Sequence, residues 1–222
     1  TYKVLETLQV FSNFNLLYFC CNQSNPMITP QQESFNQKIA IPNNFGIEVY
    51  VKREDVLHSE ISGNKFRKLK YNLTEARDLG FTKLLTFGGA YSNHIAAVAA
   101  AGKEFGFETI GLIRGEELQE KYLENPTLKK ASENGMQFEF VTRTQYRDKN
   151  NAAFLDQLKN IFGDFYLIPE GGTNELAVKG CKEILTADDK IFDFICCAVG
   201  TGGTISGIIN SLKPHQKAIG FP

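Results

Sequence analysis

The chain has 222 residues, of which 42% are apolar and 22% charged, and its 24 basic and 25 acidic residues give a formal net charge of −1. This globular composition excludes the disordered, collagen-like and low-complexity classes. The near-neutral charge supplies no broad positive field, so we expect neither nucleic acid nor a membrane as a partner. The longest apolar runs, such as 192–199, are too short to span a bilayer and are expected to be buried strands of a soluble protein.

The cysteines indicate the compartment. Two adjacent pairs, Cys20–Cys21 and Cys196–Cys197, accompany a single Cys181. No C-x-x-C spacing occurs, so the sequence predicts neither a zinc site nor a redox motif. With only three histidines and no H-x-x-x-H spacing, no metal site is expected. We expect buried, reduced thiols in a cytoplasmic protein.

The two ends differ from the rest of the chain. Residues 1–26 show no clean period and almost no charge after Glu6, and they lack the features of a signal peptide. Met27 follows, so we expect 1–26 to be a non-native or disordered extension. At the other end, 217–221 begins to resemble another strand, so we expect a C-terminally truncated fold.

Strands and helices alternate between these ends. Expected strands lie at 47–52, 83–87, 109–113, 137–141, 165–168 and 192–199, and expected helices at 65–79, 95–105, 117–133, 152–162, 175–185 and 204–212. Helix 65–79 has apolar residues at three- and four-residue steps, with Asn64 as its N-cap and Gly80 as its stop. The alternation predicts an α/β fold with mostly parallel sheets covered by helices on both faces.

The first junction that carries chemistry is SGNK at 62–65, which opens a helix. A lysine in a first helical turn lies at the positive end of the helix dipole, and Arg67 and Lys68 add further positive charge. Both effects lower the pKa of Lys65, which suits a nucleophilic amine. The alternative is a surface lysine in a basic helix start.

The second junction is GGAYSNH at 88–94, between a strand and an alanine-rich helix. Small polar side chains at a helix start present donors to a carboxylate or another anion. Ser92 and Asn93 are therefore candidate binding residues, whereas His94 alone says little. The alternative is a well-capped core helix without a ligand.

The third junction is GTGGT at 200–204, between an apolar strand and a helix. Consecutive backbone amides in such a turn form an anion-binding nest. Ile205 stands where a dinucleotide fingerprint has glycine, and no Gly-Lys-Ser/Thr follows, so the turn favours a single phosphate group over a nucleotide. A mere tight turn is the alternative.

A reactive lysine, a polar helix-start loop and a nest for one phosphate together describe a pyridoxal phosphate site. That cofactor needs a lysine for its aldehyde, an anchor for its phosphate, and donors for its phenolic oxygen and the substrate carboxylate. The coincidence of the three motifs is more specific than any one of them.

The chain resembles the fold-type II pyridoxal phosphate enzymes, specifically the 1-aminocyclopropane-1-carboxylate deaminase / D-cysteine desulfhydrase group. The motifs that carry the resemblance are KRED at 52–55, SGNKFRKLKY at 62–71, GGAYSNH at 88–94, PEGGTNELAVKG at 169–180 and GTGGT at 200–204. The match runs from about residue 38 to the end. It implies a two-lobed, three-layer α/β/α fold of the tryptophan synthase beta type. Residues 27–61 plus 166–222 would form an incomplete cofactor lobe, and 62–165 a small lobe.

The resemblance also implies roles for the motif residues. Lys65 bonds covalently to pyridoxal 5'-phosphate and moves protons during catalysis. Asn93 hydrogen-bonds the phenolic oxygen, and Ser92 lies by the substrate carboxylate and assists proton transfer, with His94 beside it. The phosphate is held by Gly200, Thr201, Gly202, Gly203 and Thr204.

The implied activity is that of a lyase or hydrolase of amino-acid metabolism. Ser92-Asn93-His94 and GTGGT favour a D-cysteine desulfhydrase type, which releases pyruvate, sulfide and ammonia. The alternative within the fold is a 1-aminocyclopropane-1-carboxylate deaminase, which releases 2-oxobutanoate and ammonia. Because the family takes its pyridine-nitrogen partner and a ring-opening tyrosine from a more distal portion, an inactive, truncated cofactor-binding chain is a further alternative, and a plain phosphate-binding module another. A homodimer is implied by the resemblance alone.

Overall fold

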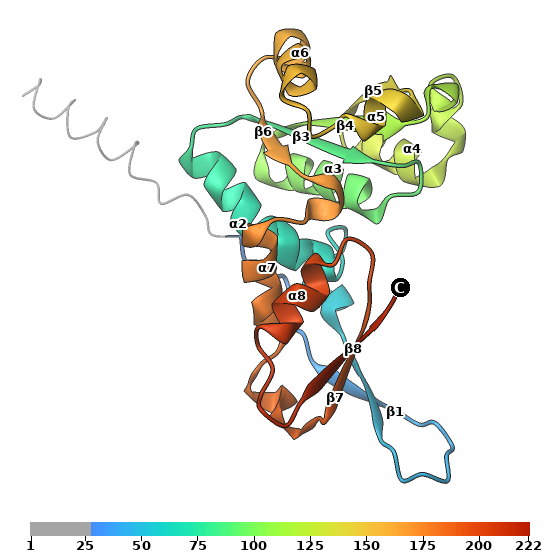
Figure 1. The fold of residues 1–222 in the computed structure, drawn as a ribbon, viewed down its shortest axis with the longest axis vertical. Helices are drawn as coiled ribbons and strands as arrows, with labels where there is room; N and C mark the ends of the chain where they lie inside the picture. Colours follow the sequence, from blue (N-terminus) through green and yellow to red (C-terminus); the bar gives the residue numbers. More distant parts are fainter. Residues whose placement is uncertain (1–27) are drawn as a thin grey trace, which may run out of the picture.

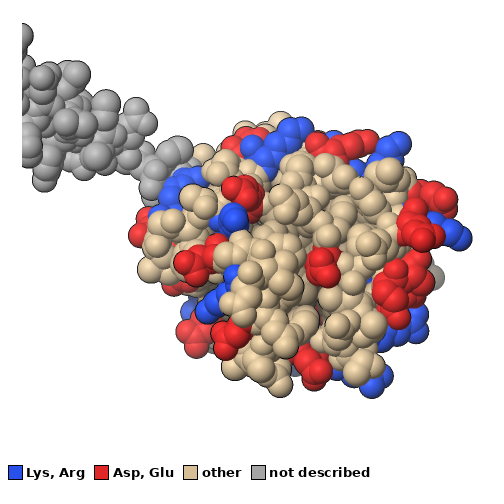
Figure 2. Space-filling view, turned by 90° about the horizontal axis from the view of Figure 1, so that it is seen from above, with Lys and Arg blue, Asp and Glu red and all other residues tan. Residues whose placement is uncertain are grey.

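The computed structural model describes residues 28–222, which form three sheets and the helices around them (Figure 1). The expectation for residues 1–26, together with Cys20 and Cys21, lies outside the described residues. Among residues 28–222, no helix is both long and apolar enough to cross a membrane. Basic and acidic side chains are interspersed over the face seen in Figure 2, so no single sign of charge dominates that view.

The largest sheet has four parallel strands in the order β5-β4-β3-β6. Its strands are β3 (Lys83–Gly88), β4 (Glu108–Arg114), β5 (Gln137–Val141) and β6 (Tyr166–Ile168). Near-continuous apolar runs such as those of β3 and β4 are typical of parallel strands that are buried on both faces. The prediction of a mostly parallel α/β fold is therefore confirmed.

Helices cover both faces of this sheet, as Figure 1 shows. On one face lie α2 (Asn64–Asp78), α3 (Asn93–Phe105) and α4 (Pro126–Glu133), and on the other α5 (Arg143–Arg147) and α6 (Ala152–Phe162). Successive side chains of a strand point to opposite faces of the sheet, so the core is divided between the two faces. Leu84 of β3 packs in the α2–α3–α4 cluster, whereas Leu85 and Phe87 pack in the α5–α6 cluster.

Two smaller sheets lie below it in Figure 1. β1 (Asn36–Ile39) and β2 (Val49–Lys52) pair antiparallel, and β7 (Phe194–Ala198) and β8 (Lys217–Phe221) pair parallel. The expectation of a buried strand at 192–199 is wrong. Residues of β7 alternate between exposed and half-buried, with Phe194 58% exposed. The reason is that α7 (Glu175–Cys181) and α8 (Gly203–Ile209) cover one face of this sheet, where Ile195 and Cys197 join their apolar cluster. The side chains on the other face stay exposed.

Three further expectations were inaccurate. The helix at 117–133 is broken into two short 3-10 turns, η2 (Glu116–Leu118) and η3 (Tyr122–Glu124), followed by α4. Asn125 caps α4 through its side chain, and Pro126 occupies the first turn of that helix. Asn64 is not an N-cap, because Gly63 takes that position. The short elements β1 and α5 were not predicted, since four or five residues carry too little periodicity.

The division into two lobes stays a prediction. One observation bears on its boundary at residue 165. β6 hydrogen-bonds to β3, so Tyr166–Ile168 belong to the same sheet as the strands within 62–165. The chain then continues through the 3-10 turn η4 (Glu170–Gly172) into α7.

Helices α2 and α7 approach closely at Gly180, where a Cβ would collide with the backbone carbonyl of Arg67. We expect Gly180→Ala to lower the free energy of unfolding by about 3 kcal/mol, because neither backbone can move away without disturbing its helix. Urea denaturation measures the change. Gly200→Ala is the matched control, since nothing lies within 4 Å of its Cβ, and it should cost about 0.5 kcal/mol or less. An equal effect of the two substitutions would contradict this packing.

Candidate active site

The start of α2 is tied to the glycine turn at 200–204, although the two segments lie far apart in the sequence. Gly63 precedes the helix with φ of +61°, a conformation that favours glycine. Asn64 is the first residue of the helix, and its side-chain amide donates to Thr204 Oγ1 at 2.7 Å. This bond holds Lys65, the next residue, beside the turn.

Two lysines of α2 converge on a single carbonyl. Lys65 Nζ lies 3.5 Å and Lys68 Nζ 2.9 Å from Gly171 O in η4. Lys68 Nζ also donates to Thr173 Oγ1 at 3.0 Å and to Thr201 Oγ1 at 3.3 Å. The amine of Lys65 is therefore linked to the glycine turn through Gly171 and Lys68.

The environment of Lys65 lowers the pKa of its amine to about 8. Burial is the largest cause, because desolvation disfavours the charged form, and the nearby Lys68 ammonium is the second. The expected reason was partly wrong: Arg67 pairs with Glu54 at 2.8 Å and with Glu183 at 3.4 Å. Burial, rather than the positive charge of Arg67, is therefore the main cause of the lowered pKa of Lys65.

This pKa gives a testable pH dependence. Trace acetylation followed by peptide mass spectrometry should show the reactivity of Lys65 rising with a midpoint near pH 8, rather than near the ordinary 10.5. Between pH 8 and pH 10.5 the Lys65 amine is mostly deprotonated in the folded chain and mostly protonated in the unfolded chain. The contribution of Lys65 to the free energy of unfolding therefore increases as pH rises through this window. Exposed Lys129 serves as the reference for reagent reactivity. A Lys65 midpoint above 10 would contradict the buried placement.

Lys68 fits the phosphate of the implied cofactor. Its side chain is only 2% exposed, and among the described residues no carboxylate lies within ion-pair distance of its ammonium. A buried cation without an anion is costly, and burial lowers the pKa of Lys68. A phosphate group would supply the missing negative charge, so the residues present suit that group.

Two glycines near this lysine, Gly171 and Gly203, leave no room for a larger side chain. A Cβ at Gly203 would lie 2.9 Å from Thr173 Oγ1 and 3.3 Å from Lys68 Cε. A Cβ at Gly171, whose φ is +66°, would lie 2.7 Å from the Thr201 side chain. The first backbone N–H groups of α8 have no intrahelical partner and are available to an anion. The glycines thus shape a small cradle beside Lys68.

Ser92 and Asn93 lie at the start of α3. Ser92 is the N-cap, and its hydroxyl accepts from the Ile95 N–H at 3.3 Å. The Asn93 side chain is exposed. A helix start with an exposed amide can donate to a carboxylate or a phenolic oxygen. The roles expected for these two residues stay predictions.

His94 is turned into the core and is 2% exposed. Thr86 donates its hydroxyl hydrogen to Ile168 O, so His94 Nε2 must be the donor in its 2.9 Å bond with Thr86 Oγ1. Nδ1 is then a bare acceptor, and it has no hydrogen-bond partner among the described residues. Burial first, and then Lys65 and Lys68, lower the pKa of His94 to about 3, so the ring is neutral. Its substrate-binding role stays a prediction.

The sequence missed two parts of this site. Lys68 entered only as a neighbour that affects Lys65, yet its spacing of three residues places both lysines on one helix face. Gly171 and Thr173 lay within a quoted motif but had no expected role. Their contacts with Lys68 and Thr201 depend on tertiary packing that no local pattern reveals.

Comparisons with known proteins agree with this geometry. A model of the family described as "Pyridoxal-phosphate dependent enzyme" matches residues 29–221. A Thermotoga maritima protein provisionally named a 1-aminocyclopropane-1-carboxylate deaminase is 34% identical over 187 residues, which cover 79% of this chain and 58% of that protein. The bifunctional D-cysteine desulfhydrase/1-aminocyclopropane-1-carboxylate deaminase of Arabidopsis thaliana is 32% identical over 185 residues, covering 76% of this chain and 45% of that protein.

A solved structure shares the fold. The crystal structure of an ACC deaminase homologue superimposes with a TM-score of 0.70 at 27% identity, covering 88% of this chain and 66% of that chain. The chain therefore spans less than two thirds of the length of these relatives.

Proposed function

Because the chain belongs to the family of pyridoxal-phosphate dependent enzymes, we propose that it binds pyridoxal 5'-phosphate at Lys65 and acts on a small amino acid. The observation that carries this proposal is the convergence of Lys65 and Lys68 on Gly171 O, beside the glycine turn. Lys65 supplies a partly buried amine for the aldehyde. Lys68 supplies the cation for the phosphate.

The chain's own residues would divide the work. Gly200, Thr201, Gly202, Gly203 and Thr204 would hold the phosphate together with Lys68. Asn93 would donate to the phenolic oxygen, and Ser92 would orient the substrate carboxylate. When bound, the cofactor supplies an electron sink for negative charge at the substrate α-carbon. Lys65 Nζ, with its pKa of about 8, would take the α-proton near neutral pH.

We propose D-cysteine desulfhydration as the reaction, in which cysteine and water give pyruvate, hydrogen sulfide and ammonia. The α C–H and the C–S bonds break, and the sulfur leaves with the bonding electrons. This is lyase chemistry, and nothing in the comparisons supports a hydrolase. The alternative, favoured by the names of both relatives, is opening of 1-aminocyclopropane-1-carboxylate with water to 2-oxobutanoate and ammonia.

The cofactor-loaded chain, incubated separately with D-cysteine and with the cyclopropane amino acid, tests the reaction. Sulfide release supports the desulfhydrase, and 2-oxobutanoate from the cyclopropane supports the deaminase. A folded, cofactor-bound chain that releases neither product contradicts both and favours a binding chain without turnover. A chain that takes up no cofactor contradicts the proposal as a whole.

Compartment and assembly are further proposals. We propose a reducing compartment, the cytoplasm, because Cys181, Cys196 and Cys197 are free thiols. The expectation of buried thiols holds for Cys181 but not for Cys196, which is exposed. We also propose a homodimer on the family resemblance, and sedimentation equilibrium would measure its mass.

A further inference from the structure

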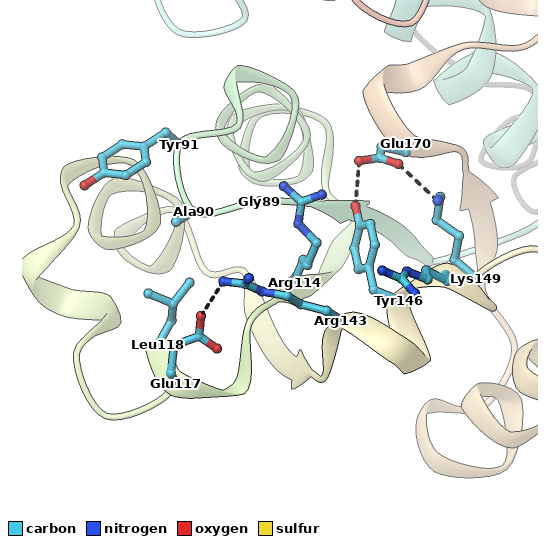
Figure 3. A pocket seen from close by; sticks show the side chains of 11 residues that line it. Gly89, Ala90, Tyr91, Arg114, Glu117, Leu118, Arg143, Tyr146, Lys149 and Glu170 are labelled. Carbon is cyan, nitrogen blue, oxygen red and sulfur yellow. Dashed lines mark hydrogen bonds and ion pairs between the residues drawn. The ribbon is translucent and has the colours of Figure 1, made fainter.

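A cavity of about 650 Å³ is lined by the residues drawn in Figure 3. Loops that follow all four strands of the parallel sheet line it. Gly89 follows β3, Arg114 ends β4, Tyr146 follows β5 and Glu170 follows β6. Ligands of open α/β sheets bind at this carboxyl edge of the strands. The cavity therefore lies where the fold favours a binding site.

Positive charge exceeds negative charge in this cavity. Its charged lining residues are four basic and two acidic: Arg114, Arg143, Arg147, Lys149, Glu117 and Glu170. Both carboxylates are already paired, Glu117 with Arg143 at 3.2 Å and Glu170 with Lys149 at 3.3 Å. Within residues 28–222, neither Arg114 nor Arg147 has a carboxylate within ion-pair distance. Arg114 and Arg147 therefore line the cavity without a carboxylate as counter-charge.

The Arg114 side chain is positioned by its contact with the Tyr146 ring. Its guanidinium lies over the ring of Tyr146, 5.6 Å from the centroid, and Figure 3 shows the side chain extending toward Gly89. Tyr146 is only 4% exposed and is fixed by its hydroxyl, which donates to Glu170 Oε1 at 2.8 Å. A guanidinium held in this way loses little side-chain freedom when it binds a carboxylate through two parallel hydrogen bonds.

We propose that this cavity binds a small organic dicarboxylate, whose two negative charges match Arg114 and Arg147. The volume is ample for such a molecule, and Ala90 and Leu118 are apolar lining residues that its carbon chain can contact. The ligand would lie next to the lysine site, because the loop of Ala90 leads into Ser92 and Glu170 precedes Gly171. None of the residues assigned above to the cofactor is used, so the inference goes beyond the proposed function.

Binding of succinate to the chain without added cofactor tests the proposal, with butyrate as a probe of the same length that lacks one charge. Calorimetry should give tighter binding of succinate, and methyl NMR shifts should fall on Ala90 and Leu118. Arg114→Gln and Arg147→Gln should each weaken succinate binding about tenfold, since each removes one charge-assisted contact. Lys159→Gln, which removes an exposed charge on α6 outside the cavity, should leave the affinity unchanged.

Several results would overturn the inference. These are equal affinities for succinate and butyrate, native affinity in the double arginine variant, or no binding at millimolar succinate. Shifts confined to the methyl groups of Thr201 and Thr204 would assign succinate to the phosphate cradle and also contradict it. Because cofactor uptake is not needed, failure of this site and failure of the proposed function give different results.

Discussion

Replacing Lys65 by alanine should abolish covalent attachment of pyridoxal 5'-phosphate to the chain. After borohydride reduction, peptide mass spectrometry should find the cofactor on residue 65 of the native chain and on no peptide of the variant. The physical reason is that burial lowers the pKa of this amine to about 8, so it is partly neutral near neutral pH. Any turnover should fall by about 10³-fold, because the group that moves the α-proton is lost.

Lys129→Ala is the matched control for this experiment. Lys129 is an exposed lysine of α4, and its loss should leave the adduct intact. An adduct on Lys68 instead of Lys65 in the native chain would show that the wrong amine has been assigned. An adduct of normal yield on any other residue would contradict the assignment equally.

Lys68→Met should weaken binding of pyridoxal 5'-phosphate by about 100-fold, which is about 2.7 kcal/mol. The side chain is buried and its ammonium contacts Gly171, Thr173 and Thr201, so the substitution removes a positive charge from the cradle. Fluorescence titration of the cofactor measures the affinity. Binding of pyridoxal, which lacks the phosphate, should change little.

The comparison of the two ligands separates a phosphate contact from general damage to the fold. Lys70→Met serves as the control, because Lys70 lies on the same helix but pairs with Glu183 at 2.8 Å. That variant should bind the cofactor as the native chain does. If Lys68→Met weakened pyridoxal and its phosphate equally, the cation would not be recognising the phosphate.

Local patterns were sufficient for most of the parallel sheet. Apolar runs predicted the strands at 83–87, 109–113 and 137–141, which the structure gives as β3, β4 and β5 with a residue or less added at each end. The pattern failed at 117–133, where Asn125 and Pro126 start a new helix inside a region of helical composition. It also failed at β7, because an apolar sequence does not say which of its faces is covered.

The site was predictable to the extent that each motif carries its own chemistry. Lys65 and the turn at 200–204 were chosen for an amine and for a phosphate nest, and the structure brings them together. The contacts of Lys68 with Thr173 and Thr201 were not predictable, because they join three segments through packing of α2 against η4 and α8. The paired carboxylates of the neighbouring cavity likewise depend on tertiary contacts.

A crystal structure of the chain grown with pyridoxal 5'-phosphate tests the central claim most directly. We predict electron density continuous from Lys65 Nζ to the cofactor, with the phosphate within hydrogen-bond distance of Lys68 Nζ and of the backbone at 200–204. Phosphate density elsewhere, or a Lys65 side chain with no bound cofactor in a fully formed crystal of the mixture, would contradict the claim that these two segments build one cofactor site.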